Sequence, residues 1–434
     1  MNEANPARRV AIVGGLRIPF CRAATAYAEA GNKDMLTAVM KALVERYELK
    51  GHRLGDVAAG ATFKHSRDWN LAREAVLDSG LARDTPAYDL QRACGTSLSA
   101  CIQIGNKIAL GGIEAGFGAG VDSVSDFPLE HTDKLRHAVL AAGRAKTLGK
   151  RLGALARIRP GDLKPQQPGV TEPHTSLSMG QSCEAMARAW KVSRESQDKL
   201  ALASHKNAVQ AWETGFYGDL VVPFAGAERD NNVRSDTSLE KLSKLRPSFA
   251  RDSQATLTAG NSSPLTDGAA GVLLASEQWA RERGLPIQAY LVDSEVAAVN
   301  FIDGDAAGDG LLMAPTYAIS RLLARNNLGF GDFDFFEIHE AFAAQVLCTL
   351  KAWKDEGFAR ERLGRDDPLG EIDREKLNVA GGSVALGHPF GATGARIVAT
   401  LAKLLAEKGS GRGLISICTG GGMGVTAILE AATH

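Results

Sequence analysis

The first third of the chain alternates short apolar runs with stretches of helical periodicity. Strands are predicted at residues 9–14, 56–63, 87–91 and 115–121, where apolar or small residues dominate short segments. Helices are predicted at residues 33–47 and 71–79 and from Cys94 onward, where apolar side chains recur every three to four positions. Strands and helices that alternate at these lengths predict βαβ units with parallel strands.

A similar alternation returns after residue 268. Strands are predicted at residues 268–275, 287–299, 333–338, 413–418 and 425–430, and helices at 311–324, from 340 and from 391 to about 408. A weak repeat supports two related halves: 28 residues separate Cys94 from Asp122, and 28 separate Gly391 from Thr419, with a helix and a strand in each interval. Two similar halves would turn their helix-opening loops toward one shared site, which places Cys94 near the loop of His388.

Residues 122–255 interrupt this alternation, and we interpret them as an inserted or lobed region. Within residues 134–164 there are nine Lys or Arg residues and one acid, Asp162. Leu148, Leu152 and Leu155 fall near one helical face of the same stretch. A solvated basic helix is one interpretation. A surface for anionic phosphates, a membrane face or an acidic partner is the other.

Composition narrows the class of protein. The 434 residues are 44% apolar and 23% charged, which is typical of a globular protein with an ample core. Fifty basic and fifty acidic side chains cancel, so attraction to nucleic acid is not expected. Six scattered cysteines without a Cys-x-x-Cys pair indicate reduced thiols and a cytoplasmic location. The first residues lack the profile of a secretory signal, and no apolar run reaches the ~18 residues of a membrane span.

Cys94 is the first candidate for chemistry. It is predicted at a corner between a strand and a helix, with Thr96 or Ser97 as the N-cap. The positive end of a helix dipole favours thiolate over thiol, so we expect a reactive sulfur there. A cysteine among small residues is more often a buried apolar group, so the assignment depends on partners elsewhere.

The C-terminal third supplies such partners. His388 lies in a Gly-His-Pro-Phe-Gly loop, His339 follows a predicted strand, and Cys418 precedes a glycine-rich run that includes Gly420. Each is a weak signal alone, because a single histidine or glycine run is usually structural. Together they meet the needs of a thiolate nucleophile: a base, donors for an oxyanion, and a second base for chemistry at carbon. No cluster with metal-ligand spacing is visible, so no metal is expected.

Motifs along nearly the whole chain resemble those of the thiolase family. They are residues 91–97 (QRACGTS), 178–180 (SMG), 257–269 (LTAGNSSPLTDGA), 339–342 (HEAF), 387–389 (GHP) and 418–424 (CTGGGMG). The resemblance implies an α/β fold of five layers, αβαβα, built from two similar βαβαβαββ halves and an inserted loop domain. The implied parts are residues 1–121 and 256–285 for the N-terminal half, 122–255 for the loop domain over the coenzyme A site, and 286–434 for the C-terminal half.

The resemblance also implies roles for single residues. Cys94 would be acylated, His388 would activate it, and Cys418 would exchange a proton with the α-carbon of acetyl-CoA. The N–H groups of Gly420 and Cys94 would form one oxyanion hole, and His388 with His339 the other. Ser263 and Met179 would lie in the substrate-binding site.

One departure from the common family pattern indicates a subgroup. Many thiolases have Asn-Glu-Ala-Phe where this chain has His339-Glu-Ala-Phe342. Histidine at this position, together with the basic stretch 145–152, resembles the β-subunits of trifunctional fatty-acid oxidation complexes. The expected function is therefore degradative 3-ketoacyl-CoA thiolysis in fatty-acid β-oxidation, with coenzyme A as a substrate and no permanently bound cofactor.

Other functions stay open at this stage. They are a biosynthetic acetyl-CoA C-acetyltransferase, a β-ketoacyl synthase, which pairs one cysteine with two histidines, and a non-catalytic lipid- or partner-binding subunit. The resemblance implies a homodimer or homotetramer. A hydratase–dehydrogenase partner and a membrane surface contacted through residues 134–164 are further expected partners.

Overall fold

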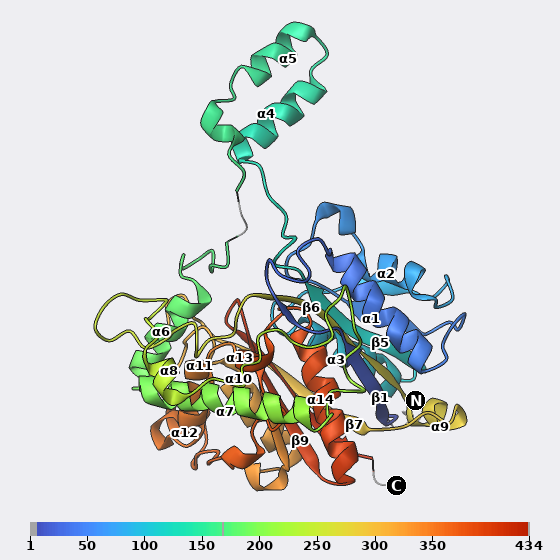
Figure 1. Cartoon of the computed structure of the whole chain (residues 1–434), viewed down its shortest axis with the longest axis vertical. Helices are drawn as coiled ribbons and strands as arrows, with labels where there is room; N and C mark the ends of the chain where they lie inside the picture. The colour runs from blue at the N-terminus through green and yellow to red at the C-terminus, as the bar shows by residue number, and fades with distance from the viewer. Residues whose placement is uncertain (1–6, 167–168, 433–434) are drawn as a thin grey trace, which may run out of the picture.

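The computed structural model describes residues 7–166 and 169–432 of the chain (Figure 1). The prediction that the chain does not begin with a secretory signal concerns residues 1–6, which lie outside the described residues. The long strands pair into one ten-stranded sheet with the order β4-β3-β5-β6-β1-β7-β10-β9-β8, and β2 pairs with β6. The strands are β1 (Val10–Arg17), β2 (Cys21–Arg22), β3 (Asp56–Ala59), β4 (Ala87–Asp89), β5 (Ala115–Asp122), β6 (Thr266–Ser276), β7 (Ala289–Ala298), β8 (Phe335–Ile338), β9 (Arg412–Thr419) and β10 (Met423–Ala431).

The strand order contains the predicted duplication. From β1 outward the sheet continues with β6, β5 and β3, and from β7 outward with β10, β9 and β8. The pairing is also the same, since β5–β6 and β9–β10 are antiparallel whereas β3–β5 and β8–β9 are parallel. The partner of β4 in the second half is reduced to a single bridge between Phe336 and Leu377. Antiparallel pairing of β1 with β7 joins the halves. The expectation of purely parallel units is therefore wrong for the closing strands of each half.

Two helices form the middle layer of the molecule. They are α3 (Thr96–Ala109) and α14 (Thr393–Lys408), which pack on each other and between strands of both halves. The outer faces are covered by α1 (Asn32–Arg46) and α2 (Leu71–Ser79) on the first half, and by α10 (Ala314–Asn326) and α11 (Ala343–Trp353) on the second. Separate apolar clusters fill the spaces around the middle helices and beneath each outer pair. The five layers expected from the resemblance are confirmed.

Most predicted elements occur, with shifted ends. The helix expected from residue 340 begins at Ala343, and the one expected from residue 311 begins at Ala314. Pro315 stands in the first turn of α10, where its missing N–H costs no intrahelical hydrogen bond. The remaining helices of this body are α9 (Glu277–Glu282), α12 (Glu356–Arg362) and α13 (Ser383–Leu386).

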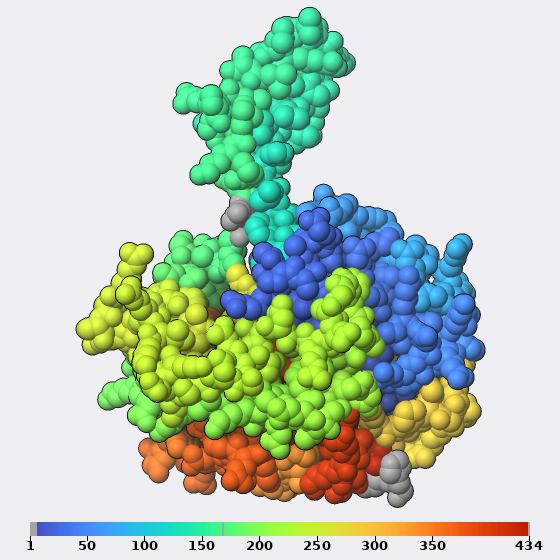
Figure 2. Space-filling view, in the orientation of Figure 1, coloured from blue at the N-terminus to red at the C-terminus, as the bar shows by residue number. Residues whose placement is uncertain are grey.

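The segment between β5 and β6 contains five further α-helices in its described part. They are α4 (Asp133–Arg144), α5 (Leu148–Leu155), α6 (Met179–Ala189), α7 (Arg194–Glu213) and α8 (Leu239–Ser243). Helices α6 and α7 pack on α11, and α7 also packs on α13, so this part of the segment lies against the second half. Helices α4 and α5 pack on each other and extend beyond the body as a hairpin (Figures 1 and 2). Within the described ranges, no helix is both long and apolar enough to cross a membrane.

Candidate active site

Cys94 lies on a tight corner between β4 and α3. Ala93 before it has a positive φ of 42°, an uncommon conformation for a residue with a side chain. Gly95 after it has no room for a side chain, because a Cβ atom there would meet Thr419 and Val425 at 2.9 Å. The predicted N-cap is wrong: Gly95 is the cap, and the Thr96 hydroxyl instead accepts from the Arg92 N–H and donates to the Ala93 carbonyl. These contacts hold the corner, so the Cys94 sulfur stays at the start of the helix.

His388 is held in the loop between α13 and α14. Its backbone N–H donates to the Thr266 hydroxyl at 2.6 Å, and its Nδ1 lies 2.6 Å from the Thr393 hydroxyl. Gly391 in the same loop donates its N–H to Asp122 at 2.6 Å, and a Cβ on Gly391 would meet the Val121 carbonyl at 2.5 Å. The loop of the second half is thereby fastened to the end of β5 in the first.

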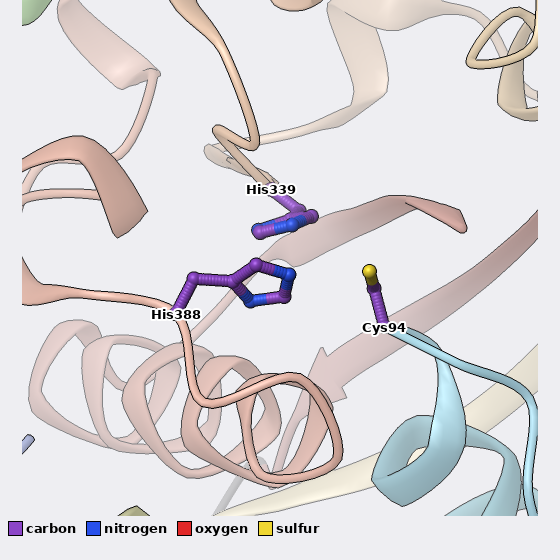
Figure 3. Close-up of side chains that lie close together, drawn as sticks. All are labelled: Cys94, His339 and His388. Atoms are coloured by element: carbon purple, nitrogen blue, oxygen red, sulfur yellow. The ribbon is translucent and has the colours of Figure 1, made fainter. Parts of the chain in front are cut away.

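His339 follows the end of β8 and completes a cluster with Cys94 and His388 (Figure 3). Its N–H donates to the Ser416 carbonyl, and its Nδ1 lies 2.9 Å from the Ser383 hydroxyl. The two imidazole rings are 4.1 Å apart between centroids. One side-chain atom of each of the three residues lies within 4.8 Å of the others, and Nε2 of both buried histidines has no hydrogen-bond partner. The prediction that Cys94 lies near the His388 loop agrees with this geometry.

The electrostatics of the cluster differ from the expected thiolate. Burial raises the pKa of the Cys94 thiol to about 12, although the Gly420 N–H acts in the opposite direction. Burial, with the nearby Arg396 charge, lowers the pKa of His388 to about 3. Burial also lowers the pKa of His339 well below its usual value. At neutral pH the resting site therefore holds a neutral thiol and two neutral imidazoles, because the loss of solvation outweighs the helix dipole.

Cys418 and Gly420 lie beside Cys94. Cys418 is the penultimate residue of β9 and is buried, and burial together with the Cys94 sulfur raises the pKa of its thiol well above the usual value. The Gly420 N–H is close enough to the Cys94 sulfur to oppose the rise in the pKa of its thiol. Met179 approaches the same loop, since its sulfur lies 3.8 Å from where a Cβ on Gly420 would stand. The glycine-rich run thus supplies a backbone donor at the nucleophile.

Ser263 lies in the wall of a cavity of about 550 Å³. Its N–H and hydroxyl both donate to the Ala341 carbonyl, two residues after His339. Basic side chains in the cavity wall are Arg22, Arg234 and Lys241. The cavity therefore combines positive charge with a direct backbone connection to the segment that carries His339.

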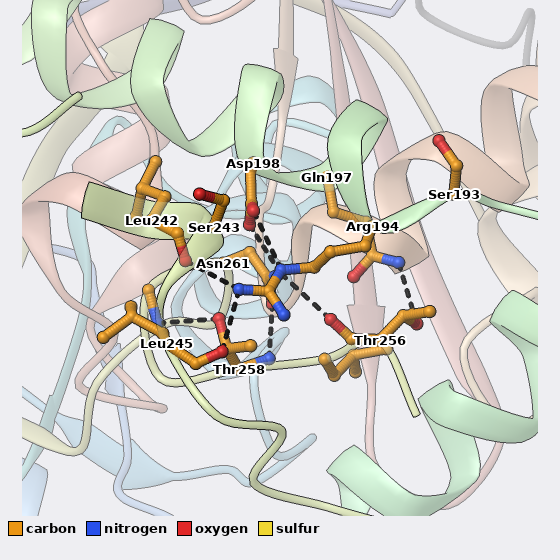
Figure 4. Close-up of polar contacts among 12 residues, drawn as sticks. Ser193, Arg194, Gln197, Asp198, Leu242, Ser243, Leu245, Thr256, Thr258 and Asn261 are labelled. Carbon is orange, nitrogen blue, oxygen red and sulfur yellow. Dashed lines mark hydrogen bonds and ion pairs between the residues drawn. The ribbon is translucent and has the colours of Figure 1, made fainter. Parts of the chain in front are cut away.

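A polar network fixes the cavity wall to α7 (Figure 4). Arg194 donates to the carbonyls of Leu242 and Leu245 and pairs with Asp198 at 2.8 Å. Asp198 in turn accepts from the Asn261 amide at 3.0 Å. The Asn261 carbonyl accepts the N–H of Ala343, the first residue of α11. Helix α7, the cavity loops and the start of α11 are therefore one hydrogen-bonded unit.

Several residues that support the site were not found from the sequence. Asp122 holds the Gly391 N–H, and Glu172 of the inserted segment accepts the Gly421 N–H at 2.6 Å. Thr393 and Ser383 contact the imidazoles, and Arg396 donates to the Ser383 hydroxyl at 2.9 Å. Thr393 stands in Gly391-Ala-Thr, which occupies the position of Cys94-Gly-Thr in the repeat, but the others had no local signal. The role of a buried charged residue can be assigned only when the groups that it contacts are known.

The cluster of Cys94, His339 and His388 has ligand atoms close enough together to hold a metal ion, which the sequence analysis did not expect. One thiol and two imidazoles are donors that suit a soft divalent cation such as Zn²⁺. The same groups also suit acyl transfer through a thiol, which needs a sulfur nucleophile beside an imidazole. The absence of a resident metal stays a prediction.

Comparisons with known proteins agree with this site. The family profile described as "Thiolase, N-terminal domain" matches residues 10–278, and "Thiolase, C-terminal domain" matches residues 294–431. The chain is 41% identical to a 3-ketoacyl-CoA thiolase of Pectobacterium carotovorum, over 97% of this chain and 96% of that protein. It is 40% identical to a 3-ketoacyl-CoA thiolase of Vibrio cholerae, over 97% of both chains.

Two solved structures share the fold. The acetyl-CoA acetyltransferase of Bacillus anthracis superposes with a TM-score of 0.80 at 30% identity, covering 99% of this chain and 100% of that chain. The Acat5 thiolase of Ascaris suum, solved in complex with coenzyme A, has a TM-score of 0.80 at 26% identity, covering 98% and 100%. The order of strands, the duplicated halves and the cysteine beside two histidines thus occur in a chain that belongs to the thiolase family.

Proposed function

We propose that this acyltransferase carries out thiolysis of 3-ketoacyl-CoA in fatty-acid degradation, with Cys94 as the nucleophile. The observation that carries the proposal is the cluster in which the Cys94 sulfur and one ring nitrogen of each histidine lie within 4.8 Å of one another, with Nε2 of both rings lacking a hydrogen-bond partner. The names of relatives about 40% identical over nearly the whole chain support the substrate class.

In the first half-reaction, the Cys94 sulfur attacks the 3-keto carbon while Nε2 of His388 takes the thiol proton. The N–H groups of Gly420 and Cys94 face the 3-keto oxygen as it becomes negative, and His339 with the protonated His388 faces the thioester oxygen that carries the charge of the enolate when the bond between C2 and C3 breaks. The bond between C2 and C3 then breaks, and its electron pair stays on the acetyl-CoA fragment. The Cys418 thiol protonates that carbon, which leaves acetyl-CoA and an acyl thioester on Cys94.

In the second half-reaction, the thiol of free coenzyme A gives its proton to the Cys418 thiolate and attacks the acyl thioester. The tetrahedral oxyanion forms on the same acyl oxygen and is again opposed by the N–H groups of Gly420 and Cys94, both of which oppose the rise in the pKa of the Cys94 thiol in the resting site. Collapse releases an acyl-CoA shortened by two carbons. The leaving Cys94 sulfur recovers its proton from His388, so both thiols are restored.

We propose that coenzyme A binds in the 550 Å³ cavity, whose wall includes Ser263, bonded to the Ala341 carbonyl two residues after His339. The phosphates of coenzyme A suit the net positive charge of the wall, where Arg22 and Arg234 stand with Lys241, which is paired with Asp236 at 2.7 Å, and the amide-containing arm suits the polar edge at Ser263. Met179 would contact the thioester end, because its sulfur approaches Gly420. We also propose the boundaries of residues 122–255 for the loop domain, since this segment supplies Lys241 and Arg234 to the cavity wall.

Mass spectrometry of the acyl-enzyme tests the proposal. After addition of a 3-ketoacyl-CoA without free coenzyme A, the acyl group is expected on Cys94. Cys101 offers a matched control, because this thiol on the same helix is buried in the central apolar cluster and donates to the Gly118 carbonyl, and Cys101→Ser should leave acylation intact. An acyl group on another cysteine, with Cys94 unmodified, would contradict the proposal. Rates over a series of chain lengths, in both directions, separate degradative from biosynthetic use.

The alternatives differ in which groups they need. A β-ketoacyl synthase also pairs a cysteine with two histidines, but a decarboxylating reaction has no use for the second thiol at Cys418. Activity with a malonyl thioester and none with acetyl-CoA would favour that alternative. A non-catalytic binding subunit has no need for unpartnered imidazole nitrogens beside a cysteine, and it would show no acylation.

We propose that the α4–α5 hairpin binds an anionic lipid surface. Nine basic residues and one acid occupy residues 134–164, and Leu148 and Leu152 are 72% and 58% exposed. Helix α5 has no buried residue and stands away from the body in Figure 2. Positive charge combined with exposed leucines matches an interfacial helix better than a solvated one.

Flotation with vesicles tests the hairpin. Wild-type protein should float with vesicles that contain phosphatidylserine and not with pure phosphatidylcholine. A Leu148→Ser/Leu152→Ser variant, and separately a Lys150→Glu/Arg151→Glu variant, should lose flotation but keep activity on a short, soluble substrate. Unchanged flotation of both variants would remove the hairpin from membrane binding.

We further propose that the chain forms a homodimer. A homotetramer would consist of two such dimers. The strand β4 lies at the edge of the sheet, and Trp69 nearby is 76% exposed, which offers a second copy both a strand edge and an apolar contact. Analytical ultracentrifugation of the wild type and Trp69→Ala tests this contact. A hydratase–dehydrogenase partner is proposed from the family resemblance alone, and co-purification of the two activities tests it.

A further inference from the structure

The two histidines of the site have similar surroundings but need opposite proton positions. Each places Nδ1 against a hydroxyl and leaves Nε2 without a hydrogen-bond partner, and both rings lie beside Cys94 (Figure 3). A base needs a lone pair on Nε2, whereas an oxyanion donor needs a hydrogen there. A neutral imidazole carries one ring proton, so the hydroxyl at Nδ1 decides which form is present. The other hydrogen bonds of each hydroxyl therefore assign the tautomer.

Thr393 assigns the tautomer of His388. The Thr393 hydroxyl donates its only proton to the Pro389 carbonyl at 3.0 Å. Toward His388 Nδ1, at 2.6 Å, the hydroxyl has only lone pairs to offer. Nδ1 of His388 must therefore carry the proton and donate. Its Nε2 is left with a lone pair, which is the form that accepts the Cys94 proton.

Ser383 assigns the opposite tautomer to His339. Nη2 of Arg396 lies 2.9 Å from the Ser383 oxygen, and a guanidinium can only donate, so this contact uses a lone pair of the serine. Nδ1 of His339, also at 2.9 Å, is the remaining contact of this oxygen among the described residues. The serine side chain is buried, and a buried hydroxyl proton without an acceptor is costly. The proton is therefore donated to Nδ1, and Nε2 of His339 carries a hydrogen toward the site.

Arg396 is itself held in place. It is fully buried next to Glu337, with 3.5 Å between Nη1 and a carboxylate oxygen. Arg396 is close enough to both imidazoles for its charge to add to burial in keeping the two rings neutral. The tautomers thus persist in the resting site.

We infer that Ser383 and Arg396 are positioning residues that hold His339 as an Nε2–H donor, so that one imidazole stabilises the oxyanion while the other accepts the thiol proton. The inference rests on the proposed thiolase reaction and deepens it. It explains how two histidines in contact perform different tasks. It also means that His339 contacts the oxyanion directly, with its donor preorganised before substrate arrives.

Nitrogen NMR of the protein labelled with ¹⁵N-histidine tests the tautomers directly. His339 is expected to show a protonated Nε2 and an unprotonated Nδ1, and His388 the reverse. The two sets of signals are assigned by their loss in His339→Asn and His388→Asn. An unprotonated Nε2 on His339 in the active wild-type enzyme would overturn the inference.

Kinetics of Ser383 variants give the second test. Ser383→Ala removes the donor to Nδ1. We expect kcat to fall about 10- to 100-fold, which is part of the loss in kcat seen when an oxyanion donor is removed. The KM for 3-ketoacyl-CoA should change by less than about 3-fold. Ser383→Thr keeps the hydroxyl and should restore most of kcat. If Ser383→Ala keeps wild-type kcat and the wild-type His339 signals, the serine does not set the tautomer.

These outcomes are separable from failure of the proposed function. A wild-type chain without thiolysis or without acyl-Cys94 would refute the function itself. A chain that acylates and turns over, but whose His339 is unaffected by Ser383→Ala, refutes only the positioning role. A loss of kcat in Ser383→Ala that Ser383→Thr does not recover would point to packing and would also count against it.

Discussion

Replacement of Asp122 by asparagine should detach the His388 loop from the first half without unfolding the protein. The Asp122 carboxylate lies at the end of β5 and is fully buried. It accepts the N–H groups of Thr62 and Phe63 within its own half and the Gly391 N–H from the other half, at 2.6 to 3.0 Å. In Asp122→Asn one oxygen becomes an amide. The remaining oxygen can serve Thr62 and Phe63, so the amide would face the Gly391 N–H, donor against donor.

Two effects on stability oppose each other. Burial raises the pKa of Asp122 from 3.8 to about 6, which corresponds to a cost of about 3 kcal/mol for keeping the carboxylate charged at neutral pH. Asparagine removes that cost but loses a hydrogen bond to a charged group, worth about 1.5–3 kcal/mol. The free energy of unfolding should therefore change by less than about 2 kcal/mol. In the wild type, the raised pKa means that this cost is absent below about pH 4, grows between about pH 4 and 6, and is complete above that range.

The effect on the His388 loop has no such compensation. An unsatisfied buried N–H costs about 1–3 kcal/mol, and the loop can avoid this cost by moving away from the introduced amide. If this whole cost is added to the activation free energy of Cys94 acylation, the rate of acylation falls about 5- to 150-fold. The assay is rapid-quench acylation by a 3-ketoacyl-CoA, read by mass spectrometry, with thermal unfolding of the same samples.

Glu184→Gln is the matched control. Glu184 is another buried carboxylate, which accepts the N–H groups of Thr256 and Leu257 on the cavity side. We expect this variant to alter the KM for coenzyme A but to acylate Cys94 at close to the wild-type rate. If Asp122→Asn acylates as fast as the wild type, or if both variants lose acylation in proportion to stability, the reasoning on the inter-half contact is wrong.

Further variants separate the steps of the reaction. Cys94→Ser should lower turnover by several orders of magnitude and leave no trapped acyl group, because a hydroxyl at this position is a much weaker nucleophile than a thiol; any acyl-enzyme in this variant argues against the assignment. Cys418→Ser should still be acylated by a simple acyl-CoA but fail to exchange the α-proton of acetyl-CoA with deuterium, and exchange at the wild-type rate would exclude Cys418 as the second base. Because burial raises the pKa of Cys94 to about 12, alkylation by iodoacetamide should accelerate about tenfold per pH unit from 7 to 10. A rate that levels off below pH 8 would instead indicate a resting thiolate.

Local sequence patterns were sufficient for most of the fold. The helix at 71–79 is predicted with its observed ends, because its apolar period stops at Gly80, which adopts the left-handed conformation that ends helices. The equal spacing after Cys94 and after Gly391 was enough to predict that two distant loops meet. The antiparallel closing strands were missed, since strand direction depends on which neighbour a strand finds and not on its own residues.

The charge state of Cys94 could not be predicted in this way. A helix N-terminus is visible in the sequence and argues for a thiolate, but burial depends on residues more than three hundred positions away, such as Cys418 and Gly420. Similarly, Asp122, Ser383 and Arg396 have no local signal for their roles. Each is a common residue type in a strand or helix, and only the fold shows which backbone N–H or imidazole it meets.

The duplicated architecture gives a physical reason why the site is neutral at rest. The nucleophile comes from the start of α3 and the base from the loop that opens α14, and these two helices form the middle layer, covered by strands of both halves. A site built where two halves meet in that layer is poorly solvated, so charge separation between Cys94 and His388 is unfavourable until an oxyanion is formed that the surrounding donors can stabilise. Proton transfer from the Cys94 sulfur to His388 should then accompany attack on the 3-keto carbon of the substrate and not precede it. A charged alkylating agent should therefore not react with Cys94 as the substrate does. A 3-ketoacyl-CoA, in contrast, should acylate Cys94 at a pH far below the pKa of its thiol.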